Sequence, residues 1–379
     1  MKGLKELRDR IDALDERLVP LLAERLKLAD AAAAERRAAG LPVSDPVRER
    51  EILTALSGRV DGDCARAVRL VYTTLFGVSK ARQRVKFGKS VPLLEKLDGA
   101  DAGELPSLAM VACAGTEGSY AQEAASRFFE VPSILYFNGF EKVFEAVEEG
   151  VCPYGVLPIE NSAAGSVASI YDLMQRHRFS IVRALKLKIR HVLLGNPGAT
   201  LGSVREVASH PHALAQCTAF LKAHPAWRAE PESNTAVSAR ALAASGRTDR
   251  AVIASRACAD LYGLRVLAED VSDTTANFTR FICIAREPRV TAKASKICLM
   301  LSLPHRPGSL SGIIAKFASA GVNLTKLESR PEVGTDFEFR FIFEFEASVS
   351  DPDVRALLAE LASDPEIEHF TFLGAFEEL

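Results

Sequence analysis

The sequence predicts a multidomain protein in which an all-α segment is followed by an α/β segment and then by a ferredoxin-like α+β segment. Three patterns predict this order. Residues 4–38 repeat apolar side chains at helical spacing, and residues from 108 onward alternate short apolar runs with small-residue turns and helices. Residues from about 296 read strand, helix, strand, strand, helix, strand. A chain of 379 residues is also too long for one ordinary core.

The composition is typical of a folded globular protein without a nucleic-acid or membrane partner. The chain is 48% hydrophobic and 25% charged, and its formal net charge of -2 argues against nucleic acid as a general partner. Its seven cysteines include no CxxC pair, which fits a reducing compartment better than a disulfide framework. Because the N-terminus lacks a signal-peptide core and no run approaches membrane-spanning length, we expect a cytoplasmic protein.

Nothing in the sequence indicates a metal or a cofactor. The seven histidines show no metal-ligand spacing, and the chain has no GxGxxG after a strand and no phosphate-loop signature. We therefore expect no cofactor and no metal. Each histidine is interpreted as an ordinary core or surface residue, with His210 set apart because it follows a strand end.

The first segment predicts three helices whose apolar stripe needs a partner. The stripe runs through Leu4, Leu7, Ile11, Leu14, Leu18, Leu21, Leu28 and Ala32. "GLPVSDP" interrupts it, Ser44 or Asp45 can cap a second helix with Pro46 in its first turn, and a third helix covers about 64–85. A first helix of roughly 35 residues is too long to hide its stripe in so small a unit, so we expect pairing with a second copy.

Cations interrupt this stripe. Arg25 stands where the pattern calls for an apolar residue, and Arg36 returns to nearly the same face eleven residues later. Buried cations need anionic partners. The candidates for the same site are Asp45, Arg48 and Glu49 at the start of the second helix, and Ser79 and Gln83 on the third. The alternative is a buried salt-bridge network with a solvated "RERE" face.

Arg8 stands apart from this cluster. It lies about 25 Å along the helix from Arg25 and roughly 100° around it, so it cannot join Arg25's site within the same helix. It could join the equivalent site of an antiparallel partner.

The α/β segment leads several strand ends into small polar residues and then helices. These stretches are "GTEGSYAQEAA", "ENSAAGSVASIYDL", "SHPHALAQC" and "ESNTAVSARAL". Exposed N–H groups at helix N-termini favour carboxylates, and ligands bind at the carboxyl ends of strands in largely parallel sheets. The alternative at each single strand is an ordinary cap or turn. Residues 86–107, before this segment, read as a linker without a clear period.

The stretch "NFTRF" at 277–281 places Thr279 and Arg280 between two phenylalanines. Phe278 and Phe281 suggest a site closed to water, and a hydroxyl and a permanent cation placed in such a site suggest a functional role. The alternative is an edge strand with an exposed arginine.

The helical segment resembles the all-helical chorismate mutase family through "LRDRIDALDERLVPLLAER", "DPVRERE" and "VYTTLFGVSKARQ". The resemblance implies an intertwined dimer in which Arg8 serves the partner's site while Arg25 and Arg48 bind the substrate carboxylates. It also implies that Asp45 and Glu49 hold the substrate hydroxyl, with Ser79 and Gln83 lining the pocket. Arg36 replaces the family's usual lysine, which keeps the charge but changes the donor geometry.

Residues 106–288 are similar to prephenate dehydratase through "GSYAQ", "PIENSAAGS", "SHPHALAQC", "LYGL" and "NFTRF". The resemblance implies a two-lobed, binding-protein-like α/β fold with Thr279 as the main catalytic residue. Arg280 would then fix a carboxylate or simply anchor the loop. The implied substrate-binding residues are Ser119, Tyr120, Glu160, Asn161, Ser162, Gly165, Ser209, Gln216, Asn277, Arg280 and Phe281.

The last segment looks like the ACT regulatory domain of phenylalanine-inhibited dehydratases through "RPGSL" and "LESRP", which by themselves are ordinary turns. The resemblance implies that phenylalanine binds at a subunit interface, near Gly308, Ser309, Leu310, Glu328, Ser329 and Arg330.

Together these resemblances imply a bifunctional chorismate mutase–prephenate dehydratase that is inhibited by L-phenylalanine and forms at least a homodimer. The expected domains are 1–88, a linker at 89–105, 106–288 and 295–379. Two rivals stay open: a solute-sensing protein with a coiled-coil dimeriser, and a dehydratase with an inactive mutase domain. The sequence leaves open whether arogenate is accepted, whether prephenate is channelled and whether other amino acids regulate.

Overall fold

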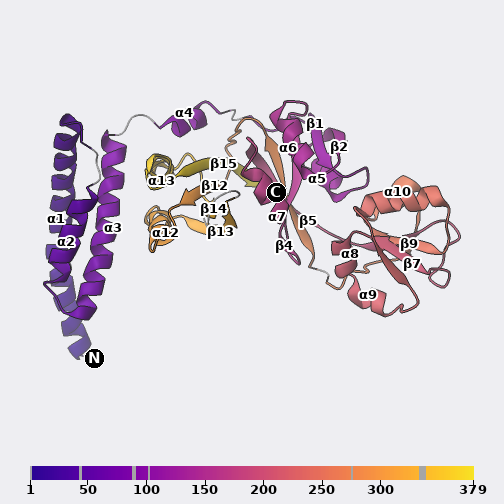
Figure 1. Cartoon of the computed structure of the whole chain (residues 1–379), viewed down its shortest axis with the longest axis horizontal. Helices are drawn as coiled ribbons and strands as arrows, with labels where there is room; N and C mark the ends of the chain where they lie inside the picture. Colours follow the sequence, from indigo (N-terminus) through magenta and orange to yellow (C-terminus); the bar gives the residue numbers. More distant parts are fainter. Residues whose placement is uncertain (1, 42–44, 88–90, 101–102, 275, 333–338) are drawn as a thin grey trace.

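The computed structural model describes residues 2–41, 45–87, 91–100, 103–274, 276–332 and 339–379. Ser44, one of the two expected helix caps, lies outside these residues. Three helices form a bundle at one end of the molecule, two α/β lobes lie at the other end, and the C-terminal domain lies between them (Figure 1). None of the described helices is long and apolar enough to cross a membrane.

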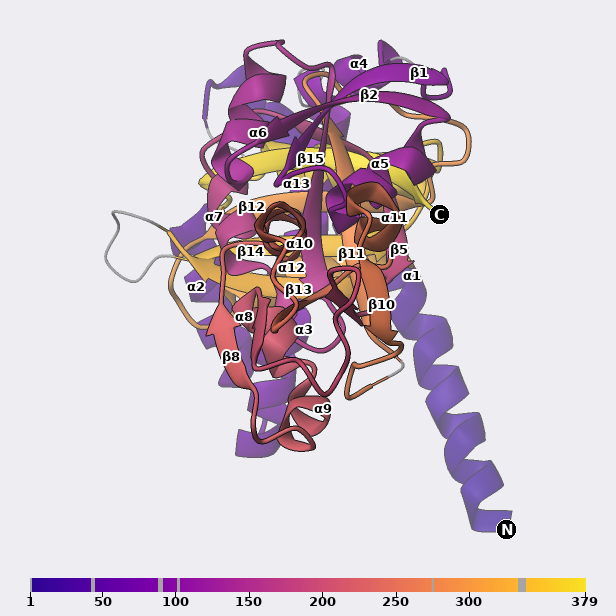
Figure 2. The ribbon, with the colours of Figure 1, turned by 90° about the vertical axis from the view of Figure 1, so that its right-hand side faces the viewer.

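The bundle has the three helices that the periodicity predicts. They are α1 (Lys2–Ala38), α2 (Pro46–Ser57) and α3 (Gly62–Phe87). The Asp45 carboxylate caps α2 by accepting a hydrogen bond from the backbone N–H of Arg48. The leucines and Ile11 of the α1 stripe are 50–64% exposed, and the N-terminal part of α1 projects away from the rest of the chain (Figure 2).

The expected linker contains a helix, α4 (Pro92–Asp98). Leu97 is buried in the core of the C-terminal domain, and Asp98 forms an ion pair with Arg355 on α13 (Pro352–Ser363). The helix was missed because a helix of about two turns is too short to show a measurable apolar period, and tertiary contacts stabilise it.

A ten-stranded sheet runs through the first α/β lobe and the C-terminal domain. In the lobe the sheet runs β2-β1-β3-β11-β5, with the two-residue β4 beside β3. The strands are β1 (Leu108–Ala114), β2 (Val131–Phe137), β3 (Tyr154–Asn161), β4 (Gly165–Ser166), β5 (Ser180–Lys188) and β11 (Phe278–Ala285). The helices are α5 (Tyr120–Phe128), α6 (Phe140–Glu148) and α7 (Ala168–Met174).

The second lobe has its own five-stranded sheet, in the order β10-β6-β9-β7-β8. Its strands are β6 (Val192–Gly195), β7 (Glu206–Ser209), β8 (Arg228–Pro231), β9 (Arg250–Ala254) and β10 (Arg265–Ala268). Its helices are α8 (Pro211–Ala215), α9 (Thr218–Lys222), α10 (Thr235–Ser245) and α11 (Ala257–Tyr262).

The two sheets are mixed, which corrects the expectation of largely parallel strands. Strand β1 is parallel to β2 and β3, but β11 is antiparallel to both β3 and β5. The reason is that the chain leaves the first lobe after β5 and returns through β11, so these two neighbours run in opposite directions. Residues 189–191 and 269–277 are the two crossovers between the lobes.

The C-terminal domain has the predicted βαββαβ order. Its elements are β12 (Lys296–Leu303), α12 (Ser309–Ser319), β13 (Asn323–Pro331), β14 (Phe339–Glu346), α13 and β15 (His369–Glu378). The end of β15 pairs in parallel with β5, where Glu377 lies opposite Arg183, so the sheet is continuous with that of the first lobe. At this junction Gly374 lies so close to β5 that an added Cβ would stand 2.2 Å from the carbonyl oxygen of Ile181.

Candidate functional sites

Four side chains that are distant in sequence meet where the two lobes join. Antiparallel pairing of β11 with β3 places Thr279 opposite Asn161. The Asn161 Oδ1 accepts hydrogen bonds from the backbone N–H groups of Ala163 and Ala164 at 3.0 and 2.9 Å. Its Nδ2 therefore faces the other way and donates to Thr279 Oγ1 and to Asn277 Oδ1, both at 2.9 Å.

This arrangement determines what the Thr279 hydroxyl can do. Its oxygen already accepts a hydrogen bond from Asn161, so its own proton is available to a bound molecule. Thr279 is half-buried at the beginning of β11. A placed neutral donor of this kind can assist the departure of a hydroxyl group.

Gln216 completes what we call the amide cluster, formed by Asn161, Gln216, Asn277 and Thr279. Its Nε2 donates to Asn161 Oδ1 at 3.3 Å and its Oε1 accepts from Asn277 Nδ2 at 2.9 Å. Gln216 comes from the second lobe, directly after α8, and Asn277 from a crossover. The sequence thus predicted residues that the fold brings together from both lobes.

His191 belongs to the same neighbourhood and was missed. Its Nε2 lies 3.0 Å from Gln216 Oε1, and the side chain is almost fully buried. Burial lowers the pKa of His191, which keeps the imidazole neutral, while the hydrogen bond with Gln216 acts in the opposite direction. A lone histidine between two strands carries no motif, so no local signal could have separated it from a core histidine.

Adjacent strand residues point to opposite faces, and this separates Glu160 and Arg280 from the cluster. These two residues lie opposite each other in the β3–β11 ladder, one position from Asn161 and Thr279. The carboxylate of Glu160 accepts from Lys326 Nζ at 3.1 Å, so it faces the C-terminal domain. Its expected contact with substrate is not supported by this placement.

Arg280 is buried in an ion network with the C-terminal domain. Its two Nη atoms bond to Glu344 at 2.7 and 2.9 Å, and its Nε bonds to Glu378. Lys296 lies 2.8 Å from Glu378. Burial alone would raise the pKa of Glu378, but the hydrogen bond from Lys296 and the charge of Arg280 hold it at about 2. Of the two expected roles, this placement favours anchoring over substrate binding.

The two phenylalanines of "NFTRF" do not form a closed box around Thr279. Phe281 is buried in the hydrophobic core of the first lobe, whereas Phe278 is 40% exposed. The expectation of a site sealed by both rings is therefore wrong. The two phenylalanines are three positions apart on β11, which pairs with β5 without interruption over this stretch, so strand alternation points their rings to opposite faces.

The remaining expected dehydratase residues serve the surrounding framework. Ser162 bridges two backbone groups on either side of Asn277, accepting from the N–H of Phe278 and donating to the carbonyl of Ala276. Ser209 is fully buried and donates to the carbonyl of Ile253 at 2.6 Å. Gly165 pairs with Asn161 in the β3–β4 hairpin. Their direct contacts with substrate stay predictions.

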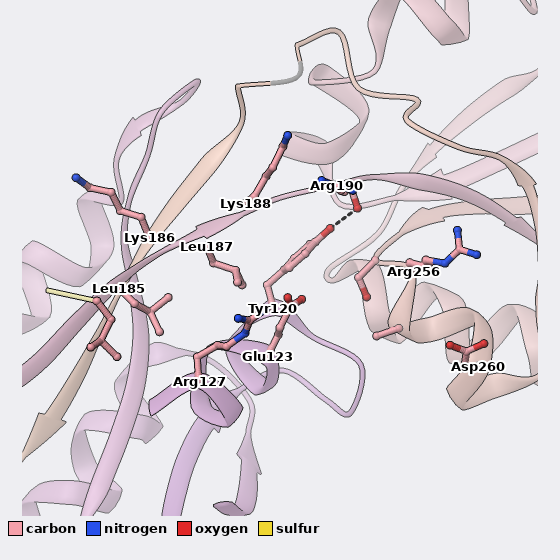
Figure 3. Close-up of a pocket in the computed structure, with 13 residues that line it drawn as sticks. Tyr120, Glu123, Arg127, Leu185, Lys186, Leu187, Lys188, Arg190, Arg256 and Asp260 are labelled. Atoms are coloured by element: carbon pink, nitrogen blue, oxygen red, sulfur yellow. Dashed lines mark hydrogen bonds between the residues drawn. The ribbon is translucent and has the colours of Figure 1, made fainter. Parts of the chain in front are cut away.

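Ser119 and Tyr120 lie outside the amide cluster. Ser119 caps α5, and the Tyr120 hydroxyl donates to the Arg190 carbonyl at 2.6 Å. Tyr120 lines a hollow of about 770 Å³ that contains none of the amide cluster's residues (Figure 3). The cationic side chains of this hollow are Arg127, Lys186, Lys188, Arg190 and Arg256.

In the bundle, the expected residues lie along the contact between α1, α2 and α3. Arg25 stacks on the rings of Tyr72 and Phe76, at 5.5 and 5.4 Å from their centroids, and its Nη1 is buried without a hydrogen-bond partner in the described part of the chain. Arg36 pairs with Asp45 at 2.9 Å. The hydrogen bond from the Arg48 N–H, followed by that from Arg36, lowers the pKa of Asp45.

Two further polar contacts line the same helices. Gln83 is buried and donates to the carbonyl of Ala29 at 2.9 Å, and Ser79 donates to the carbonyl of Leu75 at 2.8 Å. Glu49 pairs with Lys80, a residue that the sequence reading did not select. Arg48 pairs with Glu51 at the surface, and Arg8 is exposed, so neither joins Arg25 within this chain.

The expected effector residues lie at one end of α12 and along the edge strand β13. Gly308 has a φ of 92° and is the N-cap residue of α12, and the Ser309 Oγ is buried without a hydrogen-bond partner among the described residues. Leu310 packs against the domain core, and Ser329 is exposed.

Glu328 connects this edge strand to the first lobe. Its carboxylate accepts a hydrogen bond from Ser166 at 2.6 Å and forms an ion pair with Arg330 at 3.0 Å. Lys326, two residues earlier on the same face, contacts both Ser166 and Glu160. The strand that carries the expected effector residues therefore touches the strand that carries Asn161.

Two stretches of the chain match known protein families. Residues 7–84 match the model of chorismate mutase type II, and residues 111–289 match that of prephenate dehydratase. The bifunctional chorismate mutase/prephenate dehydratase of Escherichia coli is 31% identical over 94% of this chain and 92% of its own length. This relative, together with the two matched family models, shows that the chain belongs to the bifunctional chorismate mutase/prephenate dehydratase family. It is an enzyme with both activities, and the bundle and the two lobes are its mutase and dehydratase domains.

Two other relatives each match about seven tenths of the chain. Arogenate dehydratase 2 of Petunia hybrida is 38% identical over 71% of this chain and 73% of its own length. The crystal structure of prephenate dehydratase from Arthrobacter aurescens, in complex with L-Phe, is 30% identical with a TM-score of 0.65. It covers 71% of this chain and 90% of that protein. Metal-binding clusters of His, Cys, Asp and Glu are absent from the described residues.

Proposed function

We propose that Thr279 is the group that assists loss of the ring hydroxyl from prephenate in the dehydratase domain. The observation that carries this is the hydrogen bond from Asn161 Nδ2 to Thr279 Oγ1, which leaves the threonine proton free. In the reaction the bond to the ring carboxylate breaks and carbon dioxide leaves. Its electron pair completes the aromatic ring as the C–O bond breaks, and the departing hydroxide takes a proton and becomes water.

A substitution at Thr279 tests this role. Thr279→Ala should lower phenylpyruvate formation by roughly 10²-fold or more, because a placed proton donor contributes that much. Thr279→Ser keeps the hydroxyl and should retain much more activity. Chorismate consumption should stay normal in both, since the mutase residues lie in another domain, and prephenate should accumulate. A folded Thr279→Ala enzyme with a near-normal dehydratase rate would remove Thr279 from the mechanism.

For the mutase we propose a site shared between two chains, in which Arg8 of one chain joins Arg25, Arg36, Asp45, Arg48, Glu49, Ser79 and Gln83 of the other. Support comes from the exposed apolar stripe of α1 and from the buried Nη1 of Arg25, which has no hydrogen-bond partner among the residues that the structure describes. A dianionic substrate needs cations and a compact conformer for this rearrangement, and no nucleophile or metal.

For the C-terminal domain we propose an ACT domain, residues 295–379, that binds phenylalanine at a subunit interface and inhibits the dehydratase. The βαββαβ fold and the Arthrobacter aurescens relative crystallised with L-Phe support this. Isothermal titration of the full chain with phenylalanine, together with phenylpyruvate formation at rising phenylalanine concentrations, tests it. The same assay with arogenate in place of prephenate decides whether the domain also accepts that substrate.

A further inference from the structure

The orientation of each amide in the amide cluster can be worked out from backbone groups. Two backbone N–H groups, from Ala163 and Ala164, can only donate, so the atom of Asn161 that they contact is its oxygen. The Gln216 atom that contacts this oxygen must then be its Nε2. Gln216 Oε1 is consequently turned toward Asn277 and His191.

The same logic fixes the tautomer of His191. Because Gln216 Oε1 can only accept, His191 Nε2 must carry the proton of this 3.0 Å hydrogen bond. The other ring nitrogen, Nδ1, is buried and has no hydrogen-bond partner in the described part of the chain. A second proton there would be desolvated and unpaired, so the neutral Nε2–H form is the stable one.

The backbone and the packing around His191 keep its Nε2–H donor in one position. It lies in the first crossover, and its carbonyl accepts from Val271 N–H in the second crossover at 3.1 Å. Two residues earlier, Ile189 N–H donates to the carbonyl of Asn277 at 2.8 Å. The side chain is only 3% exposed, so ring rotation is restricted by packing. Gln216, by contrast, is a flexible side chain carried by the second lobe.

We propose that His191 is a positioning residue for the dehydratase reaction, which orients the Gln216 amide and, through Asn161, leaves the Thr279 proton free for the substrate. The inference rests on the proposed role of Thr279. If Gln216 turned over, its Oε1 would face Asn161 Oδ1, and two acceptors would repel each other. Asn161 would then lose the hydrogen bond that its Oδ1 accepts from Gln216, which is one of the contacts that keep its Nδ2 turned toward Thr279.

Two amide substitutions at His191 form a matched pair for the test. In His191→Gln the side-chain amide reaches about as far as Nε2 and can still donate to Gln216, whereas in His191→Asn it reaches only about as far as Nδ1. We expect His191→Asn to lower the dehydratase kcat roughly tenfold, the usual effect of one lost hydrogen bond, with little change in KM. His191→Gln should recover most of the rate.

Two double-mutant cycles on the full-length enzyme separate this role from others. If His191 acts through Gln216, adding His191→Asn to Gln216→Leu should cause no further loss of kcat. If the effect of His191 reaches Thr279, adding His191→Asn to Thr279→Ala should also cause no further loss of kcat. The mutase rate and the thermal unfolding midpoint of each variant serve as controls for folding.

Each alternative outcome overturns the proposal in a recognisable way. Equal kcat values for His191→Asn and the wild type would show that the contact has no positioning effect. A change confined to KM would indicate that His191 touches the substrate directly. Additive losses with Gln216→Leu would show independent roles. Full dehydratase activity in Thr279→Ala alone would instead defeat the proposed role of Thr279, whatever the His191 variants do.

Discussion

The guanidinium of Arg280 forms a bidentate ion pair with the carboxylate of Glu344, at N–O distances of 2.7 and 2.9 Å. Both side chains are buried, and they belong to different domains. Arg280 is the immediate neighbour of Thr279 on β11, while Glu344 lies on the central part of the C-terminal sheet. The strand that carries the dehydratase hydroxyl is therefore held by a charge network of the C-terminal domain.

Removing Arg280 should destabilise the enzyme strongly. Arg280→Met leaves Glu344 buried without its bidentate partner and removes one of the partners of Glu378, and breaking a buried pair in this way costs about 3–5 kcal/mol. Urea unfolding monitored by circular dichroism measures the change. The control is Arg256→Met, which removes an exposed pair with Glu269 and should cost less than about 1 kcal/mol. Equal effects of the two substitutions would contradict the importance of the buried network.

Glu378 should contribute stability that depends on pH. Its folded-state pKa is about 2, against an ordinary value of 4.5, so its contribution is fully present above the ordinary value. The contribution is lost progressively as pH falls from there toward the folded-state pKa. Glu378→Gln should therefore be less stable than the wild type at about pH 7, and the difference should shrink by about pH 3. If the unfolding free energies of Glu378→Gln and the wild type differed by the same amount at both pH values, the ionised Glu378 carboxylate would not be the source of the stability.

Two glycines in the C-terminal domain should respond in opposite ways to alanine. Gly374→Ala places a Cβ 2.2 Å from the backbone of β5, so β15 must shift, and we expect a loss of more than about 3 kcal/mol. Gly312, inside α12, has nothing within 4 Å of an added Cβ. Gly312→Ala should stabilise by up to about 1 kcal/mol through helix propensity. Unfolding midpoints of the two variants, measured side by side, test this junction between β15 and β5.

Mixing two inactive mutase variants should restore activity if Arg8 serves the partner's site. Arg8→Ala and Arg25→Ala chains that exchange freely form about half heterodimers, each with one intact site of two, which gives about one quarter of wild-type chorismate consumption. The two residues are 17 positions apart on one helix, about 25 Å, so one chain cannot supply both to one site. No recovery after subunit exchange, verified by mass spectrometry, would argue against a shared site.

Glu328→Gln should weaken phenylalanine inhibition by roughly tenfold, because charged hydrogen bonds contribute about 1.5–3 kcal/mol. Inhibition is measured relative to the uninhibited rate of each variant. Glu346→Gln, at an exposed position on β14, is the matched control and should leave inhibition unchanged. Deleting residues 295–379 is a poorer test, since it would also strip Glu344 and Glu378 from Arg280. An unaltered response of Glu328→Gln would remove this carboxylate from the effector site.

Much of the dehydratase site could be predicted from the sequence, because its residues stand in short motifs at strand ends. Asn161, Gln216, Asn277 and Thr279 were all expected, and the structure brings them together from both lobes. His191 could not be predicted in this way. Its importance depends on a single contact with Gln216, 25 residues away, and no local pattern records that contact.

The sequence by itself determined the helical first segment, the alternating α/β segment and the βαββαβ order, because periodicity and turn chemistry act over a few residues. Only the tertiary structure decided that Glu160 and Arg280 face the C-terminal domain while Asn161 and Thr279 meet Gln216 of the second lobe in the amide cluster. Alternation along a strand is local, but what lies against each face is set by distant parts of the chain. The apolar stripe of α1 was likewise visible in the sequence because it is a local pattern, and the tertiary structure of the single chain leaves it exposed.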